Sequence, residues 1–237
     1  IGLAMQCHQL FPTTVATEQL QLDPLDLAAK LQTLLALRGE AVGNPSDGCA
    51  WTGDLNRVWQ LHQHPDFQDL AVQVSDAAWV YLDTLGFDRD AVALHLQRCW
   101  PVISDWDQGI GRHHHPNAHL SAVLYLSGTG TGEEGLLRLH APSLLNELVP
   151  GLAVGHDGPL SAEALTQQAH WDLTPQPGLL ILFPSRLEHS VTTNGDPDAL
   201  RCSISFDFVL TAPAHREPSE YLAPHPSDWS SPDQPSA

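Results

Sequence analysis

The spacing of apolar residues changes from helical to strand-like near Asp90, and this change constrains the fold of the 237-residue chain more than any other feature. Before it, apolar residues recur three or four positions apart, as on one face of a helix. Beyond it, apolar runs and strict alternations are separated by turn-rich stretches, which is the pattern of strands. Such runs occupy residues 92–96, 120–126, 136–139, 179–183 and 200–210. The chain is therefore expected to be an α+β protein in which N-terminal helices back a mostly antiparallel β-sandwich or barrel.

Two long helices are expected in the N-terminal part. The dipeptide Asp23-Pro24 has the pattern of an N-cap followed by a first-turn proline, and Gly39 is expected to end this first helix. A second helix is expected over about 65–85, where apolar residues keep helical spacing. A shorter helix is expected within 51–61.

This pattern divides the chain into a helical support region, a β-stranded core and a tail rich in Pro and Ser, at residues 1–89, 90–211 and 212–237. The long, irregular stretch 141–170 is expected to be an insertion loop that carries substrate contacts. The tail has too few apolar residues for a core of its own. It is expected to be disordered or an extended arm, with Tyr221 and Trp229 as docking points.

The charge balance excludes several kinds of partner. The chain has 28 Asp and Glu residues against 10 Lys and Arg, for a formal net charge of −18. Nucleic acids and anionic membrane surfaces need clustered basic residues, so neither is expected as a partner. No apolar run is long enough to span a bilayer and no secretory signal is visible. We therefore expect a cytoplasmic protein whose four cysteines are reduced or buried thiols, namely Cys7, Cys49, Cys99 and Cys202.

The chain has fourteen histidines, and three of them follow one another at 113–115, just before the strand-like run 120–126. If this segment is extended, His113 and His115 point to the same side and His114 to the other. Two imidazoles on one side can bind one metal ion at about 2.0–2.1 Å. An exposed His-rich turn is the alternative that this cluster alone leaves open.

Two later segments add to this pattern. His189 follows an apolar run and a Pro-Ser turn, a position that suits either a metal ligand or a structural histidine. The run 200–210 has a period of two, with apolar residues on one face and polar residues on the other, namely Arg201, Ser203, Ser205 and Asp207. An arginine beside a hydroxyl on the same face suits a carboxylate ligand, because a guanidinium donates two parallel hydrogen bonds. The alternative is an outward-facing polar row on an edge strand.

Together these motifs resemble the iron(II)/2-oxoglutarate-dependent oxygenases. The resemblance is greatest to a group with the consensus H-x-H-P, S-G-x-x-Y, P-x-x-G-x-L-x-x-F-P-x-x-x-x-H and R-x-S-x-S-F. The corresponding residues are 113–116, 121–125, 175–189 and 201–206, with Ala122 in place of the consensus Gly. The resemblance covers about residues 50–210.

The resemblance implies a double-stranded β-helix, a jelly-roll or cupin-like core. It further implies that the chain hydroxylates an unidentified small-molecule or peptide substrate, with formation of succinate and CO2. The implied iron(II) ligands are His113, His115 and His189. The implied 2-oxoglutarate contacts are Arg201, with its far carboxylate, and Ser203 and Tyr125.

One departure from the superfamily is that His115 stands where a His-x-carboxylate pair has its Asp or Glu. Three neutral imidazoles leave iron(II) its full charge, whereas the usual facial triad includes one carboxylate. His115 is then a third ligand, or the carboxylate comes from elsewhere, or His115 serves a neighbouring role. The other H-x-D sequence, at 170–172, is expected to be structural.

Other activities remain open at this point. One alternative is a three-histidine, cupin-like dioxygenase that does not use 2-oxoglutarate. Another is a non-enzymatic metal-binding or interaction protein on the same fold. A homodimer formed through the N-terminal helices or the tail is a further hypothesis.

Overall fold

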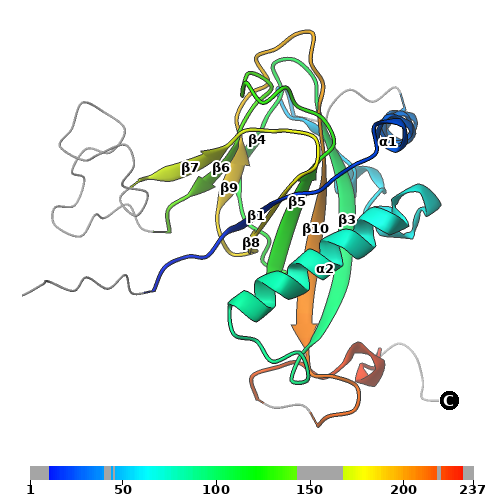
Figure 1. The fold of residues 1–237 in the computed structure, drawn as a ribbon, viewed down its shortest axis with the longest axis vertical. Coiled ribbons are helices and arrows are strands. Elements are labelled where there is room, and N and C mark those ends of the chain that lie inside the picture. Colours follow the sequence, from blue (N-terminus) through cyan, green and yellow to red (C-terminus); the bar gives the residue numbers. More distant parts are fainter. Residues whose placement is uncertain (1–10, 40–43, 45, 143–167, 218–219, 232–237) are drawn as a thin grey trace, which may run out of the picture.

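The computed structural model describes residues 11–39, 44, 46–142, 168–217 and 220–231, and its strands form two antiparallel sheets (Figure 1). The larger sheet has the order β1-β8-β5-β10-β3-β2. Its strands are β1 (Ala16–Gln19), β2 (Trp51–Thr52), β3 (Ala93–Ser104), β5 (Leu120–Tyr125), β8 (Leu179–Pro184) and β10 (Arg201–Thr211). The smaller sheet has the order β4-β9-β6-β7. Its strands are β4 (Ile110–His113), β6 (Leu137–His140), β7 (His170–Leu173) and β9 (His189–Val191).

The molecule has three layers, in which the six-stranded sheet lies between the helices and the four-stranded sheet. Helix α2 (Gln68–Thr84) lies across the outer face of the larger sheet (Figure 1). One apolar core fills the space between helices and sheet and includes Val74, Tyr81, Leu124, Ile204 and Phe206. A second core fills the space between the two sheets and includes Val123, Tyr125, Leu139, Phe183 and Val191. The predicted α+β fold with helices behind a β core is confirmed.

Both predicted long helices are present. The Asp23 carboxylate accepts hydrogen bonds from the backbone N–H groups of Leu25 and Asp26, each at 3.0 Å, so helix α1 (Pro24–Arg38) begins as expected. Gly39, with φ of 61°, ends it. Helix α2 begins three residues later than expected, because Pro65–Phe67 forms a separate 3-10 turn.

Strand β10 shows how the period of two creates a buried site. Its apolar residues, such as Ile204 and Phe206, face the helices, whereas Arg201, Ser203 and Ser205 face the smaller sheet and line a cavity. The strand pairs with β3 on one side and β5 on the other. The polar row is therefore inside the molecule, and the edge-strand alternative is wrong.

The helix expected within 51–61 is absent. Instead, β2 pairs with β3, and the chain continues through 3-10 turns at Asp54–Asn56 and Leu61–Gln63. The reason lies in tertiary packing, because a Cβ on Gly53 would lie 2.5 Å from Pro101 Cδ. Arg57 also adopts a left-handed conformation, with φ of 66°, which interrupts any helix.

The N-terminal region contributes strands as well as helices to the fold. Strand β1 pairs antiparallel with β8, with Ala16 opposite Leu182, and β2 pairs with β3. These two short strands form the two edges of the six-stranded sheet.

The described part of the tail is attached to the end of the sheet through Leu222 and His225. Leu222 packs against a cluster formed by Leu82, Val92 and Leu210, and the rings of His225 and His95 lie 5.1 Å apart. Tyr221 and Trp229 are 85% and 59% exposed, so neither docks on the core. The expectation that these two aromatic residues are docking points stays a prediction.

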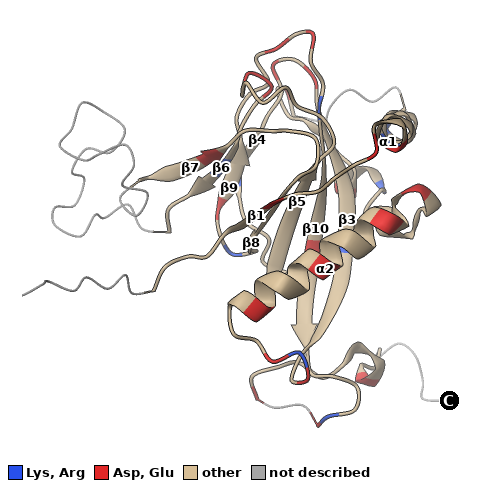
Figure 2. Ribbon diagram, in the orientation of Figure 1, with Lys and Arg blue, Asp and Glu red and all other residues tan. Residues whose placement is uncertain are grey.

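Several further expectations can be placed on the structure. Residues 143–167, most of the expected insertion loop, lie outside the described residues, as does Cys7. Cys49, Cys99 and Cys202 are free thiols. Within the described ranges, no helix combines the length and the apolar character that crossing a bilayer requires. Figure 2 shows acidic residues along α2, where Asp69, Asp76 and Asp83 are all exposed.

Candidate metal centre and adjoining cavity

Three imidazoles converge between the two sheets. His113 ends β4 and lies opposite His189 in the β4–β9 pairing, and His115 follows two residues after His113. The ring centroids are 4.3 Å apart for His113 and His189, 5.0 Å for His115 and His189, and 5.4 Å for His113 and His115. One potential ligand atom from each residue lies within 4.8 Å of the others. The structure therefore brings together the three histidines that the sequence singled out.

All three rings present the same nitrogen to the cluster. Nδ1 of His113 lies 2.8 Å from the Gly111 carbonyl oxygen, and Nδ1 of His189 lies 2.9 Å from the Leu187 carbonyl oxygen. Nδ1 of His115 lies 2.6 Å from Oδ1 of Asp207. A carbonyl or carboxylate oxygen only accepts, so each Nδ1 carries a hydrogen and Nε2 is the nitrogen left to bind a metal. This is the state in which neutral imidazoles bind a metal.

Burial keeps His113 and His189 neutral. Burial lowers the pKa of His113, and burial together with the neighbouring His113 lowers the pKa of His189 to about 3. At neutral pH these two rings are therefore unprotonated and available as ligands.

Asp207 lies directly behind His115 and is fully buried. Burial alone would raise its pKa, but hydrogen bonds from His115, Arg98 and Ser121 hold that pKa below its usual value. The sequence placed Asp207 on the polar face of its strand without giving it a role. The sequence could have indicated such a role, because alternation along the strand puts Asp207 on the same face as Arg201.

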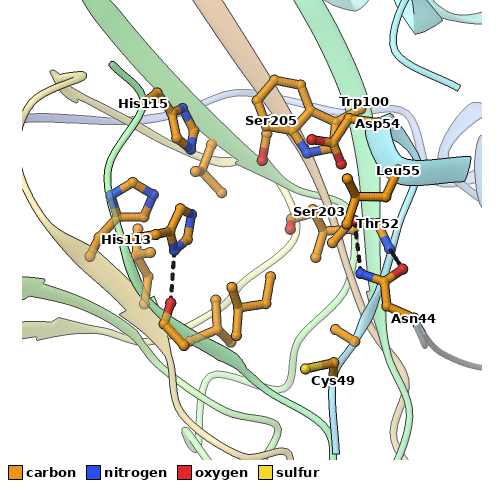
Figure 3. Close-up of a pocket in the computed structure, with 18 of the residues that line it drawn as sticks. Asn44, Cys49, Thr52, Asp54, Leu55, Trp100, His113, His115, Ser203 and Ser205 are labelled. Carbon is orange, nitrogen blue, oxygen red and sulfur yellow. Dashed lines mark hydrogen bonds between the residues drawn. The ribbon is translucent and has the colours of Figure 1, made fainter. Parts of the chain in front are cut away.

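A cavity of about 520 Å³ adjoins the cluster. This volume is typical of a site for a small organic ligand. Figure 3 shows His113 and His115 on one side of the cavity and Trp100, Asp54 and Leu55 on the other.

Arg201 lines the same cavity and is only 1% exposed. Its Nη2 donates to the Tyr125 hydroxyl at 2.8 Å, and its guanidinium lies 4.9 Å from the Tyr125 ring centroid. Its Nε and Nη1 are buried and have no hydrogen-bond partner in the described part of the chain. A buried guanidinium with free donors is costly unless an anion pairs with it. The donor set therefore fits a carboxylate ligand.

The two other predicted contacts lie beside Arg201. Tyr125 is fully buried, and burial raises the pKa of its hydroxyl despite the neighbouring arginine. Ser203 is 2% exposed, pairs with Tyr125 across β10 and β5, and lines the cavity. Both are placed to support a ligand of Arg201.

The H-x-D sequence at 170–172 lies elsewhere, on β7 at the edge of the smaller sheet. Asp172 is paired with Arg138, with two contacts of 2.7 Å, and His170 is not part of the histidine cluster. Its place in the fold agrees with the structural role expected for it.

Comparison with known proteins finds a family model that matches this part of the chain. The family model described as "Putative 2OG-Fe(II) oxygenase" matches residues 98–207, which include all three clustered histidines and Arg201. None of the proteins with curated descriptions matches the chain.

Solved structures show the same fold at low sequence identity. The non-heme alpha ketoglutarate dependent carbocyclase SnoK from nogalamycin biosynthesis aligns with a TM-score of 0.58 at 14% identity, over 84% of this chain and 82% of that one. A Pseudomonas putida prolyl-4-hydroxylase aligns with 0.52 at 18% identity, over 83% and 92%. HygX from Streptomyces hygroscopicus, with nickel and 2-oxoglutarate bound, aligns with 0.53 at 14% identity, over 86% and 84%. The predicted double-stranded β-helix is thereby confirmed.

Proposed function

We propose that the protein oxidises an organic substrate with iron(II) and 2-oxoglutarate, because residues 98–207 match the family model of the 2OG-Fe(II) oxygenases. The reaction consumes dioxygen and converts 2-oxoglutarate to succinate and CO2. The prime substrate that we propose is a small molecule or a peptide segment, because it must enter a cavity of about 520 Å³.

One observation carries this proposal. A buried arginine with two unpaired nitrogen donors lines the same cavity as three imidazoles whose Nδ1 atoms donate to oxygen acceptors, which leaves Nε2 of each for a metal. A ligand that satisfies both features has a metal-chelating end and a distant carboxylate. 2-Oxoglutarate has both, and it is bound with nickel in the HygX structure.

We assign the following roles to the chain's own residues. His113, His115 and His189 hold the metal through Nε2, and Arg201 holds the far carboxylate of 2-oxoglutarate, with Ser203 and Tyr125 as supporting donors. When bound, iron(II) and 2-oxoglutarate supply the oxidation of the substrate by dioxygen. Trp100, which is 5% exposed, and Val102 form an apolar wall that limits water around the reacting groups.

The test is anaerobic mixing of the protein with iron(II) and 2-oxoglutarate. We expect a metal-to-ligand charge-transfer band, followed by succinate formation when air is admitted. Arg201→Met should raise the dissociation constant of 2-oxoglutarate by at least about tenfold, because hydrogen bonds to a charged group contribute about 1.5–3 kcal/mol. Arg138→Met is the matched control, since Arg138 is paired with Asp172 away from the cavity.

The same experiment separates the alternatives. Oxygen consumption that does not depend on 2-oxoglutarate would favour a three-histidine dioxygenase, in which Arg201 binds the substrate's own carboxylate. Failure to bind iron, with an intact fold in His189→Ala, would favour a non-enzymatic protein. A cytoplasmic location, a homodimer and the domain boundaries near residues 89 and 211 stay predictions.

A further inference from the structure

The proposed centre lacks a carboxylate among its ligands, yet a buried carboxylate lies directly behind one of them. We infer that Asp207 is a positioning residue that supplies the missing negative charge through His115. It orients the ring so that Nε2 faces the ion and makes this imidazole a stronger donor than the other two. The inference rests on the proposed metal site.

The contacts of Asp207 fix its position closely. Oδ1 accepts from His115 Nδ1 at 2.6 Å and from Ser121 Oγ at 2.8 Å, and Oδ2 accepts from Arg98 Nη2 at 2.5 Å. Three donors on two oxygens leave the carboxylate little freedom to rotate. Charge-assisted contacts of this kind are roughly twice as strong as neutral ones.

Strand register brings these groups together. Asp207 lies opposite Arg98 of β3 and opposite Ser121 of β5, so its two cross-strand neighbours are two of its three side-chain donors. His115 enters from the segment that leads into β5, and its backbone N–H is held by the Ser185 carbonyl at 2.9 Å. The carboxylate is therefore part of the sheet and not of a loop.

The three imidazoles differ in what holds them. His113 and His189 donate to backbone carbonyls, whereas His115 donates to an ionised side chain. An anionic acceptor pulls the Nδ1 proton more strongly and so raises the electron density at Nε2. The ion would then have two ordinary imidazole ligands and one with partial anionic character.

A simpler role for Asp207 would be to neutralise Arg98. Arg98 does not require a buried acid for this purpose, because its side chain is 26% exposed. It also lies 3.8 Å from the carboxylate of Asp54 and 4.7 Å from the ring centroid of Trp100. The two roles differ in their effect on metal affinity, which makes them separable.

The test compares Asp207→Asn and Asp207→Ala with Asp172→Asn, a remote aspartate that is also paired with an arginine. Nickel binding to the metal-free protein is measured by calorimetry, without 2-oxoglutarate. In Asp207→Asn the amide oxygen can still accept from His115 while the charge is lost, and the amide NH2 replaces the oxygen that accepts from Arg98. We expect the nickel dissociation constant to rise about 10–100-fold in Asp207→Asn, at least as much in Asp207→Ala, and not in Asp172→Asn.

A spectroscopic readout adds a second criterion. With iron(II) and 2-oxoglutarate, the charge-transfer band of Asp207→Asn should move to shorter wavelength, because a less electron-rich iron gives up its electron less readily. If Asp207→Asn does not fold, the double variant Arg98→Gln/Asp207→Asn removes both charges together and should show the same loss of nickel affinity.

The outcomes are distinct. Unchanged nickel affinity in a folded Asp207→Asn, with only a lower melting temperature, would reduce Asp207 to a counter-ion of Arg98 and overturn the inference. A wild-type protein that binds no metal would overturn both this inference and the proposed function. A wild-type protein that binds nickel but not 2-oxoglutarate would overturn the proposed function alone.

Discussion

At the scale of single residues, Tyr125 is the hydrogen-bond partner that the structure describes for the Arg201 guanidinium, through Nη2 at 2.8 Å. Tyr125→Phe removes this partner and should raise the dissociation constant of 2-oxoglutarate by about tenfold, since a hydrogen bond to a charged group contributes about 1.5–3 kcal/mol. Titration of the charge-transfer band measures it. Tyr81→Phe is the control, because its hydroxyl bonds the Thr14 carbonyl far from the cavity. Equal affinities in both variants would contradict the role of Tyr125.

A second prediction at this scale compares His189, which belongs to the histidine cluster, with His170 of the H-x-D sequence at 170–172. His189→Ala should abolish stoichiometric nickel binding, because it removes one of three converging Nε2 atoms. His170→Ala should leave nickel binding unchanged, since His170 lies on the outer strand β7. Calorimetry on both variants checks this, and a loss of binding in His170→Ala would show that the wrong cluster has been assigned.

Reasoning from single residues found most of the site, because the side of a strand to which a side chain points follows from its position in the sequence alone. The rings of His113 and His115 stack with centroids 5.4 Å apart, and Arg201 and Ser203 line the cavity from one face of β10, as alternation predicts. Asp207 was missed because the carboxylate was sought at the second position after a histidine. Its contact with His115 depends on which strands are neighbours, and no local pattern gives that.

At the scale of elements, Gly178 fixes the entry into β8. Its φ is 84°, and a Cβ there would lie 2.3 Å from the Leu20 carbonyl oxygen. Gly86 has nearly the same φ, 87°, with nothing within 4 Å of its would-be Cβ. Gly178→Ala should therefore reduce the free energy of unfolding by about 1–3 kcal/mol more than Gly86→Ala, because overpacking adds to a shared backbone strain. Urea denaturation of the two variants measures the difference, and equal losses would show that the backbone at Leu20, just after β1, shifts without a loss of stability.

Element boundaries were predictable where the signals are local. The N-cap Asp23 and the terminal Gly39 act within one turn of their helix, so α1 begins and ends where expected. The segment 51–61 was assigned a helix because its strand partner, β3, is about fifty residues away, and its tight contact at Gly53 involves Pro101. Strand β1 was missed for the same reason, since it pairs with β8.

At the scale of the whole molecule, the proposed ion would connect the two sheets. His113 and His189 belong to the smaller sheet, whereas His115 leads into β5 and contacts Asp207 of β10 in the larger one. Nickel at 100 times its dissociation constant should therefore raise the free energy of unfolding by about 2.7 kcal/mol, and a chelator should reverse this. Thermal melts measure the shift. The same shift in His189→Ala would mean that the ion binds elsewhere.

The layered fold was predictable as a class, because the change of apolar period separates helices from strands along the chain. The arrangement of strands in the two sheets was not, since orders such as β1-β8-β5-β10 join segments that are distant in sequence. The attachment of the tail through Leu222 and His225 likewise depends on which surface lies next to it.

The acidic surface, seen along α2 in Figure 2, affects the rate at which 2-oxoglutarate associates with the protein. A molecule of net charge −18 repels a dianion such as 2-oxoglutarate at long range. Added salt shortens this repulsion to within about 10 Å at 0.1 M, so the association rate of 2-oxoglutarate should rise with ionic strength in stopped-flow measurements. A rate that falls would show that the positive charges in the cavity dominate its approach. Where opposite charges attract a ligand, salt lowers the association rate; here, where like charges repel it, salt would raise that rate.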